Sequence, residues 1–362
     1  MARAALSTPT FFFRLACAHS ALVIALWPAS LARLMDEAWV LRLHQDELLL
    51  GTFPAVMAGF TLTAMRRWTG NPVTPNPVPA LLAVWTAGRA VALFAPWGSA
   101  AAAAFPLLLG AVLLRHVLRH GDVRNLPLVT IIGCIGVAGL GRAFLPDAAS
   151  ALLRIVVALT VALLLIASSR IVPALGRSFI GRESRRVGLA GETAAAMASV
   201  AVLLVWALRP RGPDTALAVG LLAVFQAVRI GSWNVWGMAR HPRFLAVLAG
   251  ALALPAGLAV LSAEAVANAT VGAVGIHVLL VGGLGLSSLA IMTSMVRKRA
   301  GDALRWSRSE AILYATLCLA WPLRIFADGS ATMLAAASLA WGIAFAGFAL
   351  LFGRLGDASS GA

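Results

Sequence analysis

The sequence has few charged residues and few of the side chains that perform polar chemistry. Only 12% of its 362 residues are Asp, Glu, Lys or Arg, and it contains a single Tyr and a single Lys, Lys298. An ordinary soluble domain carries about 25% charged residues, so a water-soluble fold of this composition could not cover its own surface. The scarcity of tyrosine and lysine also argues against chemistry that depends on tyrosine clusters or on a lysine Schiff base.

Cysteine is scarce as well. Cys17, Cys134 and Cys318 each stand alone in an apolar stretch, and no pair has the C-x-x-C spacing. This pattern argues against a disulfide framework or a zinc site. We expect the three thiols to behave as small core residues.

Apolar residues are abundant and fall into long blocks. They make up 60% of the chain, and the mean hydropathy is +0.89. Blocks of about 20 residues with almost no charge match the length of helix that crosses about 30 Å of hydrocarbon. Alternation with a period of two, which is typical of a barrel, is missing. The sequence therefore predicts an all-α, polytopic transmembrane helical bundle of about 12 helices forming one domain over residues 1–362. The expected spans are 11–30, 47–66, 78–97, 99–116, 126–146, 149–172, 189–208, 214–236, 243–262, 266–295, 309–327 and 330–352.

The arginines indicate the orientation of these spans. They concentrate in the links after even-numbered spans, as in the link 173–188, and are sparse after odd-numbered spans. Basic residues in short loops stay on the cytoplasmic side, so we expect both termini in the cytoplasm. The formal net charge of +15 is explained by this topology and by anionic headgroups, and we expect no nucleic-acid partner. The stretch Pro28-Ala29-Ser30 resembles a signal-peptide cleavage site, but losing the first span would leave an odd number, so we expect a retained helix.

Two arginines fall deep inside predicted spans, Arg89 in the third and Arg229 in the eighth. A charge at the bilayer centre costs about 2.5–3.5 kcal/mol on insertion scales, which makes such residues functional candidates. Each could pair with a carboxylate and only fix packing. Alternatively, each could grip an anion or a propionate with two parallel hydrogen bonds. The sequence leaves both interpretations open.

The histidines differ in predicted depth. His19 falls in the middle of the first span, where a satisfied core residue is the expected role. His44 opens the second helix on the periplasmic side, and His277 lies deep in the tenth among glycines that permit close approach. These two are the best ligand candidates, because neutral imidazole is a common ligand of haem iron and copper. Three others lie at the cytoplasmic face, where a solvated role is expected: His116, His120 and His241.

Several stretches of the sequence resemble the NnrS family of membrane proteins. The stretch 44–51, continuing through 58–64 to 68–70, resembles the second helix of that family. Further similarities follow in the same order at 171–173 with Gly181, at 229–242 and at 275–293. The second and tenth spans also resemble each other, since each carries a histidine followed by a run that contains glycine.

This resemblance implies a polytopic protein of the bacterial inner membrane, associated with haem, copper and responses to nitric oxide in denitrification or nitrosative stress. The matching positions make His44, Glu47, His241 and His277 the candidate metal ligands. By the same resemblance, a haem b would be held by His277, with His44 as the second candidate, and its iron would bind nitric oxide or a related small ligand. Arg89 or Arg142 would then offer a charge partner to its propionates.

Several positions depart from the family pattern. Asp46 stands where a second histidine of the second-helix motif is expected, and Arg142 stands where the fifth helix is expected to carry one. A third expected histidine falls near Leu248, and the stretch 299–302 replaces a Gly-His-Thr-Gly motif. We therefore expect fewer cofactors than in a typical member.

Two other classes of function remain open. Twelve spans with buried arginines also suit a transporter of a small anionic or metal-related substrate. No repeat relating spans 1–6 to 7–12 supports that reading. A scaffold or sensor would use the basic link 173–188 as its docking surface, although a solvated topology determinant is the simpler interpretation of that link.

Overall fold

The computed structural model describes residues 10–94, 98–181, 189–267, 273–301, 306–327 and 330–352. These residues are folded almost entirely into helices, and no strand occurs among them. Ten of the described helices are long and apolar enough to cross a membrane, and the shorter α5 is also apolar. The predicted all-α, polytopic helical fold is therefore confirmed.

Each of the twelve predicted spans corresponds to a helix or to a continuous helical run. The α-helices are α2 (Phe11–Leu31), α3 (Glu37–Asp46), α4 (Phe53–Thr69), α5 (Val78–Phe94), α6 (Gly98–Arg119), α7 (Leu126–Phe144), α8 (Ala149–Ile180), α9 (Leu189–Leu208), α10 (Pro213–Gly231), α11 (Pro242–Ala267), α12 (Ala273–His277), α13 (Leu286–Arg299), α14 (Arg308–Ile325) and α15 (Ala331–Leu351). Two π-helical segments, η1 (Glu47–Thr52) and η5 (Val278–Gly285), join α3 to α4 and α12 to α13. Short 3-10 helices are η2 (Val123–Asn125), η3 (Pro146–Ala148) and η4 (Trp236–Arg240).

Several boundaries differ from the prediction. The sixth span runs on to Ile180 in α8 rather than ending at residue 172, and the eighth ends at Gly231 in α10 rather than at residue 236. The second span begins at Glu37 rather than at residue 47, because α3 carries polar side chains that hide it from a hydropathy reading. The ninth helix runs on to Ala267, and the tenth begins at Ala273, whereas the sequence placed that start at 266.

The contacts divide the chain into two compact units. Unit 1 comprises Met1–Val156, Met292–Arg305 and Leu334–Ala362, and unit 2 comprises Val157–Ile291 and Trp306–Met333.

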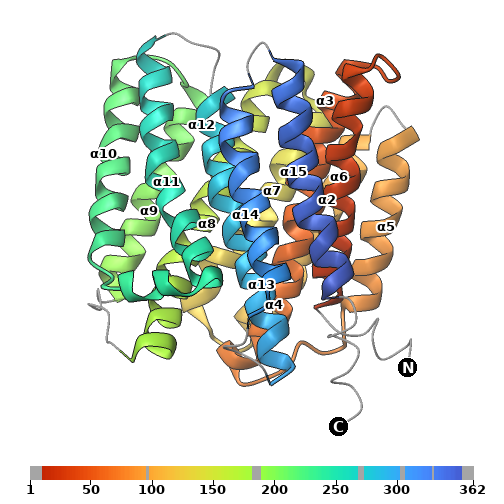
Figure 1. Cartoon of the computed structure of the whole chain (residues 1–362). Helices are drawn as coiled ribbons and strands as arrows, with labels where there is room; N and C mark the ends of the chain where they lie inside the picture. The colour runs from red at the N-terminus through yellow and green to blue at the C-terminus, as the bar shows by residue number, and fades with distance from the viewer. Residues whose placement is uncertain are drawn as a thin grey trace. The chain divides into compact units, whose positions relative to one another are not determined.

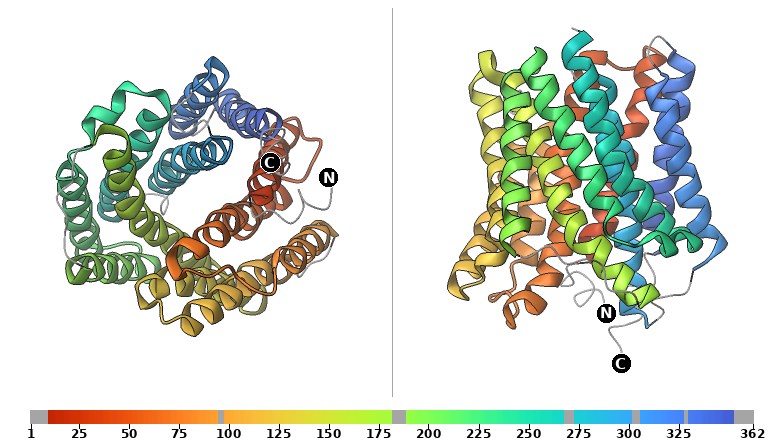
Figure 2. Two further views of the ribbon diagram at one scale, coloured as in Figure 1. Left: turned by 90° about the horizontal axis from the view of Figure 1, so that it is seen from below. Right: turned by 90° about the vertical axis from the view of Figure 1, so that its left-hand side faces the viewer.

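In unit 1, α6 packs most extensively against α7 and also against α5, as Figure 2 shows for the orange and yellow helices. The α6 and α7 backbones meet at two glycines. A Cβ on Gly110 would lie 2.6 Å from the Cα of Gly133, so only glycine fits at that crossing. Small residues of this kind let transmembrane helices approach closely.

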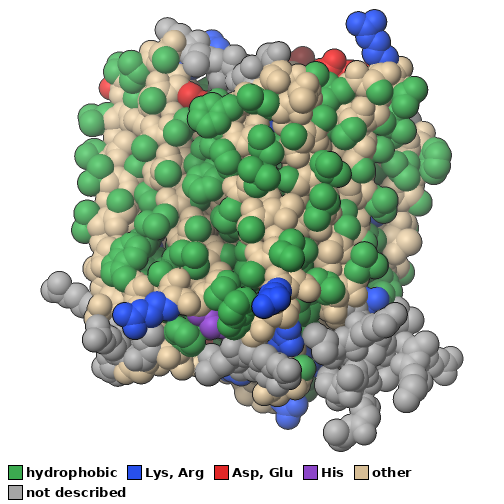
Figure 3. All heavy atoms as spheres, in the orientation of Figure 1, with side chains coloured by type: hydrophobic (Ala, Val, Ile, Leu, Met, Phe, Trp, Pro, Cys, Tyr) green, Lys and Arg blue, Asp and Glu red, His purple; other side chains and the backbone are tan. Residues whose placement is uncertain are grey.

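In unit 2, α11 packs against α10, η4, α12 and η5. The helices α9, α10 and α11 lie beside one another at the left of Figure 1, and their outward side chains in Figure 3 are mostly hydrophobic, as expected for a lipid-facing surface. Close contacts occur at glycines again, because a Cβ on Gly257 would lie 2.5 Å from the side chain of Leu279.

The two π-helical segments, η1 and η5, lie in the second and tenth predicted spans, whose sequences resemble each other. η1 follows His44 by three residues, and η5 begins directly after His277. A π-helical turn accommodates one extra residue in a helix and is frequent at functional sites. The similarity of the second and tenth spans therefore extends to their backbone.

The cysteines differ from one another in their surroundings. All three are free thiols, and Cys17 is buried whereas Cys134 and Cys318 are exposed. The expectation of small core residues is right for Cys17 only.

Candidate functional site

The second transmembrane run supplies two adjacent buried carboxylates. Its helix begins after Asp36, whose side chain accepts a hydrogen bond from the amide of Trp39 at 2.7 Å, and it continues through η1 to Thr69. Asp46 and Glu47 lie where the α-helix changes to the π-helix, and each is only 3% exposed. Carboxylates this deeply buried need charged or hydrogen-bonding partners.

Glu47 lies between a histidine and an arginine. Its Oε2 accepts a hydrogen bond from Nε2 of His19 in α2 at 2.8 Å and is 2.5 Å from Nε of Arg89 in α5. The other ring nitrogen, Nδ1, forms a hydrogen bond with the hydroxyl of Thr52, 2.8 Å away. His19 is thus the satisfied core histidine that the sequence predicts, and it joins the first helix to the second.

Two residues hold the Arg89 guanidinium in place. A Cβ on Gly51 would lie 2.7 Å from Nη1 of Arg89, so the guanidinium lies directly against the bare backbone of η1. Trp85, one turn earlier in α5, has its ring centroid 5.5 Å from Cζ of Arg89 and donates its indole N–H to the Gly51 carbonyl at 3.1 Å. Together these contacts fix the position and the plane of the guanidinium.

Several polar atoms of this cluster are buried without a hydrogen-bond partner among the described residues. They are Nε, Nη1 and Nη2 of Arg89 and Oε1 of Glu47, and of these Nε lies within ion-pair distance of Oε2 of Glu47. The side chain of Arg89 is only 9% exposed and that of Glu47 only 4%. Buried polar atoms in folded proteins are almost always hydrogen-bonded, so these atoms indicate a ligand or ordered water.

Asp46 belongs to a second ion pair beside the first. It pairs with Arg142 of α7 and accepts a hydrogen bond from Ser99 of α6. The same arginine donates to Oε1 of Gln45 at 3.2 Å. Asp46 and Arg142 are two of the positions at which the family resemblance leads to an expected histidine, and the structure brings them into direct contact.

His44 lies beside this cluster in α3 and is half-buried. Its Nδ1 accepts a hydrogen bond from the indole N–H of Trp27 at 3.2 Å. A neutral imidazole that accepts at Nδ1 carries its proton on Nε2 and has no lone pair there for a metal. The contact with Trp27 therefore disfavours His44 as a ligand through Nε2.

The other histidine candidates lie in unit 2. His277 ends α12 and is half-buried. The nearby glycines serve helix packing, because a Cβ on Gly282 would meet the ring of Trp321 at 2.8 Å and one on Gly283 would meet Leu254 at 2.7 Å. His241, expected to be solvated, is instead only 8% exposed and is surrounded by the rings of Phe179, Phe244 and Trp306.

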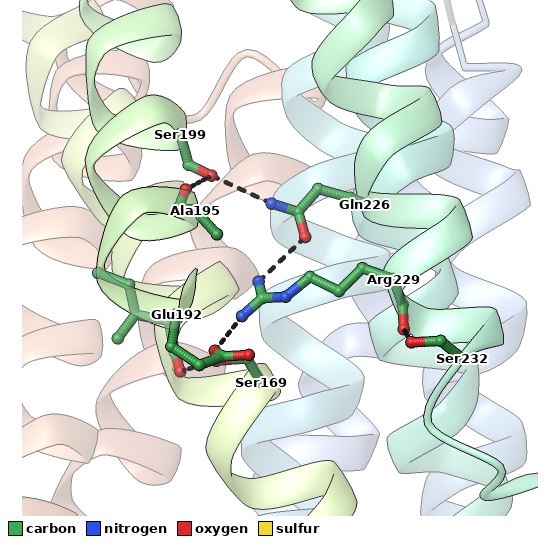
Figure 4. Close-up of polar contacts among 8 residues, drawn as sticks. Ser169, Glu192, Ala195, Ser199, Gln226, Arg229 and Ser232 are labelled. Carbon is green, nitrogen blue, oxygen red and sulfur yellow. Dashed lines mark hydrogen bonds and ion pairs between the residues drawn. The ribbon is translucent and has the colours of Figure 1, made fainter. Parts of the chain in front are cut away.

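Unit 2 also contains a polar network around Arg229 (Figure 4). Arg229 of α10 forms an ion pair with Glu192 of α9 and donates to Gln226 at 3.4 Å. Gln226 in turn donates to the hydroxyl of Ser199 at 3.1 Å. Of the two interpretations open for Arg229, pairing with a carboxylate is the one that the structure contains.

One further pair could not be seen in the sequence. Arg243, the first residue of the predicted span 243–262, is fully buried in α11 and donates to Oε2 of Glu310 in α14 at 3.1 Å. No local pattern in the sequence indicates the carboxylate that it meets.

The sequence thus singled out Glu47, Arg89 and Arg142 as candidates, but it did not indicate that His19, Gly51, Trp85 and Ser99 would be their partners. Only the four-residue spacing of Trp85 and Arg89, which places them on one helix face, was a local signal. Within the described residues, no group of three or more His, Cys, Asp or Glu side chains gathers closely enough to hold a metal ion.

Comparison with known protein families gives a match over most of the chain. A family model described as NnrS protein matches residues 10–355, nearly the whole chain. A search among curated proteins found no similar sequence.

Proposed function

Because the chain belongs to the NnrS family, we propose that it acts in the bacterial response to nitric oxide, as a multi-pass protein of the inner membrane with both termini in the cytoplasm. The proposal rests on the family match over residues 10–355 and on the buried carboxylate of Glu47, which lies at the π-helical turn of the stretch that resembles the family's second helix. Inserting a charged side chain into the membrane costs free energy, so such residues are candidates for a function. In addition, π-helical turns are frequent at functional sites.

A haem is the cofactor that the family resemblance suggests, and the histidines constrain how it would be held. His44 is disfavoured because Trp27 donates to its Nδ1. Arg142 is already held by Asp46 and Gln45, which leaves it little capacity for a propionate. His277 would hold the haem iron through its imidazole, which is a common ligand of haem iron. A haem b held there would supply an iron that binds nitric oxide, which reaches it through the lipid.

Copper does not fit the described residues. Glu47 is engaged by His19 and Arg89, and Asp46 is engaged by Arg142. Both carboxylates are thus already paired with arginines, and the described residues offer no set of three donors. His44, Glu47, His241 and His277 remain separate candidates rather than one metal centre.

The test of the haem proposal is optical. The purified protein, before and after reconstitution with haemin, should show a Soret band that His277→Ala abolishes and His120→Ala retains. His120 is an exposed histidine that contacts Asn71, so it is a suitable control. Absence of the band in the reconstituted wild-type protein would refute the haem proposal.

The role in the cell needs a separate experiment. A strain that lacks the chain should grow more slowly under nitric oxide than the same strain complemented with it, and the two should grow alike without nitric oxide. Equal growth under nitric oxide would count against the proposed role.

A second candidate function is transport of a small anion, and Arg89 favours it. Its two terminal nitrogens have no hydrogen-bond partner in the described part of the chain, whereas Arg229 is engaged by Glu192 and Gln226. Uptake of formate by proteoliposomes that His277→Ala retains and Arg89→Gln abolishes would support transport over haem chemistry. Lack of uptake by wild-type proteoliposomes would remove this candidate.

A further inference from the structure

In unit 1, the Arg89 guanidinium has N–H donors for which the described residues supply no hydrogen-bond acceptor. Nε faces Oε2 of Glu47 at 2.5 Å, while Nη1 and Nη2 have no hydrogen-bond partner among the described residues. These two nitrogens carry four N–H donors in one plane. A side chain that is 91% buried cannot meet this demand from bulk water, since only 9% of it is exposed.

The surrounding residues preserve this geometry. Gly51 gives the guanidinium room against the backbone, and the Trp85 ring lies beside it. Trp85 also contacts His19 edge to face, with ring centroids 5.3 Å apart, and His19 holds Glu47. The donors are therefore fixed in advance, which lowers the entropic cost of binding a small ligand.

We propose that Arg89, held by Glu47, Gly51 and Trp85, forms a buried binding site for a small, planar, monovalent oxyanion such as a short carboxylate. Two coplanar acceptor oxygens match the two terminal nitrogens of a guanidinium in a fork of parallel hydrogen bonds. This site uses none of the histidines assigned to haem, so it does not rest on the proposed role in the nitric oxide response.

The charge of the cluster sets the selectivity. Glu47 balances Arg89, and Asp46 balances Arg142, so the ligand finds directed donors rather than excess positive charge. A multiply charged anion would lose much hydration without a matching countercharge, and a spherical anion cannot use the fork. The site therefore selects formate and nitrate over sulfate and chloride.

The experiment is direct binding of formate to the full-length protein in lipid nanodiscs, measured by saturation-transfer NMR. The wild-type protein should bind formate saturably, with competition by nitrate and not by equal concentrations of sulfate or chloride. Arg89→Lys keeps the charge but loses the fork, and it should weaken binding by about tenfold or more. Gly51→Ala keeps Arg89 but places a methyl group against Nη1, and it should weaken binding similarly.

The matched control is Arg229→Lys, the same substitution at a buried arginine whose guanidinium is engaged by Glu192 and Gln226. It should leave formate affinity unchanged. Lack of saturable binding to wild-type protein would refute the site, because ordered water would then account for the donors of Arg89. Equal weakening by Arg229→Lys, or equal competition by sulfate, would also refute it. If Arg89→Lys fails to fold, the competition of nitrate, sulfate and chloride with formate for the wild-type protein tests the proposal instead.

Discussion

At the residue scale, four arginines inside the two units each form an ion pair with a carboxylate of the same unit. Arg89 meets Glu47, Arg142 meets Asp46, Arg229 meets Glu192 and Arg243 meets Glu310. Removing one partner of a buried pair leaves an uncompensated charge, which costs far more than the pair itself contributes. These contacts therefore fix which helices are neighbours, even where their net contribution to stability is small.

The pair of Asp46 and Arg142 gives a test of this account. Arg142→Met should lower the free energy of unfolding by about 3–5 kcal/mol, because Asp46 is then buried without its cation. The double variant Asp46→Asn with Arg142→Met should recover most of that loss. Thermal unfolding in detergent, followed by circular dichroism, measures the stability of the single and double variants. Arg66→Met, a substitution of an exposed arginine, is the control. Equal destabilisation of the single and double variants would mean that Arg142 acts through packing rather than through charge.

The sequence predicted the buried arginines but not their partners. Hydropathy places Arg89 and Arg229 inside spans, and insertion cost marks them as candidates. Their carboxylates come from other helices, and Arg142 lies 96 residues from Asp46 along the chain. Such pairs depend on which helices become neighbours, and a single sequence does not record this.

At the element scale, helix positions followed from hydropathy, whereas helix ends and π-helical turns did not. The α3 segment was missed because Arg42, Gln45 and Asp46 make it polar, although tertiary partners satisfy Asp46 and Gln45 in the fold. The π-helical turns could not be predicted because they depend on how η1 and η5 pack. The similarity of the second and tenth spans was the only sequence signal that they share a backbone feature.

The crossing of α6 and α7 gives a prediction at this scale. Gly110→Ala would place a methyl group 2.6 Å from Cα of Gly133, so it should lower the free energy of unfolding by about 1–3 kcal/mol through overpacking. Gly133→Ala is the matched control, because its Cβ would lie no closer than 4.0 Å to Cα of Gly110. Melting temperatures of the two purified variants give the comparison. A Gly133→Ala variant as unstable as Gly110→Ala would contradict the asymmetry of this crossing.

At the scale of the whole molecule, composition determines the fold class. Few charges and long apolar blocks leave the bilayer as the only suitable solvent, and helices satisfy their own backbone groups within it. The distribution of arginine then predicts the orientation. Composition determines neither the partners of buried side chains nor the cofactor, because both depend on a small number of residues brought together by packing.

The orientation itself can be measured at two exposed links of unit 1. Val123, in the link between α6 and α7, should face the cytoplasm, and Asp147, in the link between α7 and α8, should face the periplasm. In a background with Cys17, Cys134 and Cys318 replaced by alanine, a membrane-impermeant maleimide should label Asp147→Cys in cells with a permeabilised outer membrane. It should label Val123→Cys only after the inner membrane is disrupted. The reverse pattern would place the arginine-rich links outside, against the bias with which basic loops are retained during insertion. It would also move the Asp46 and Arg142 pair, which lies near the α7 end that leads to Asp147, to the cytoplasmic half of the membrane.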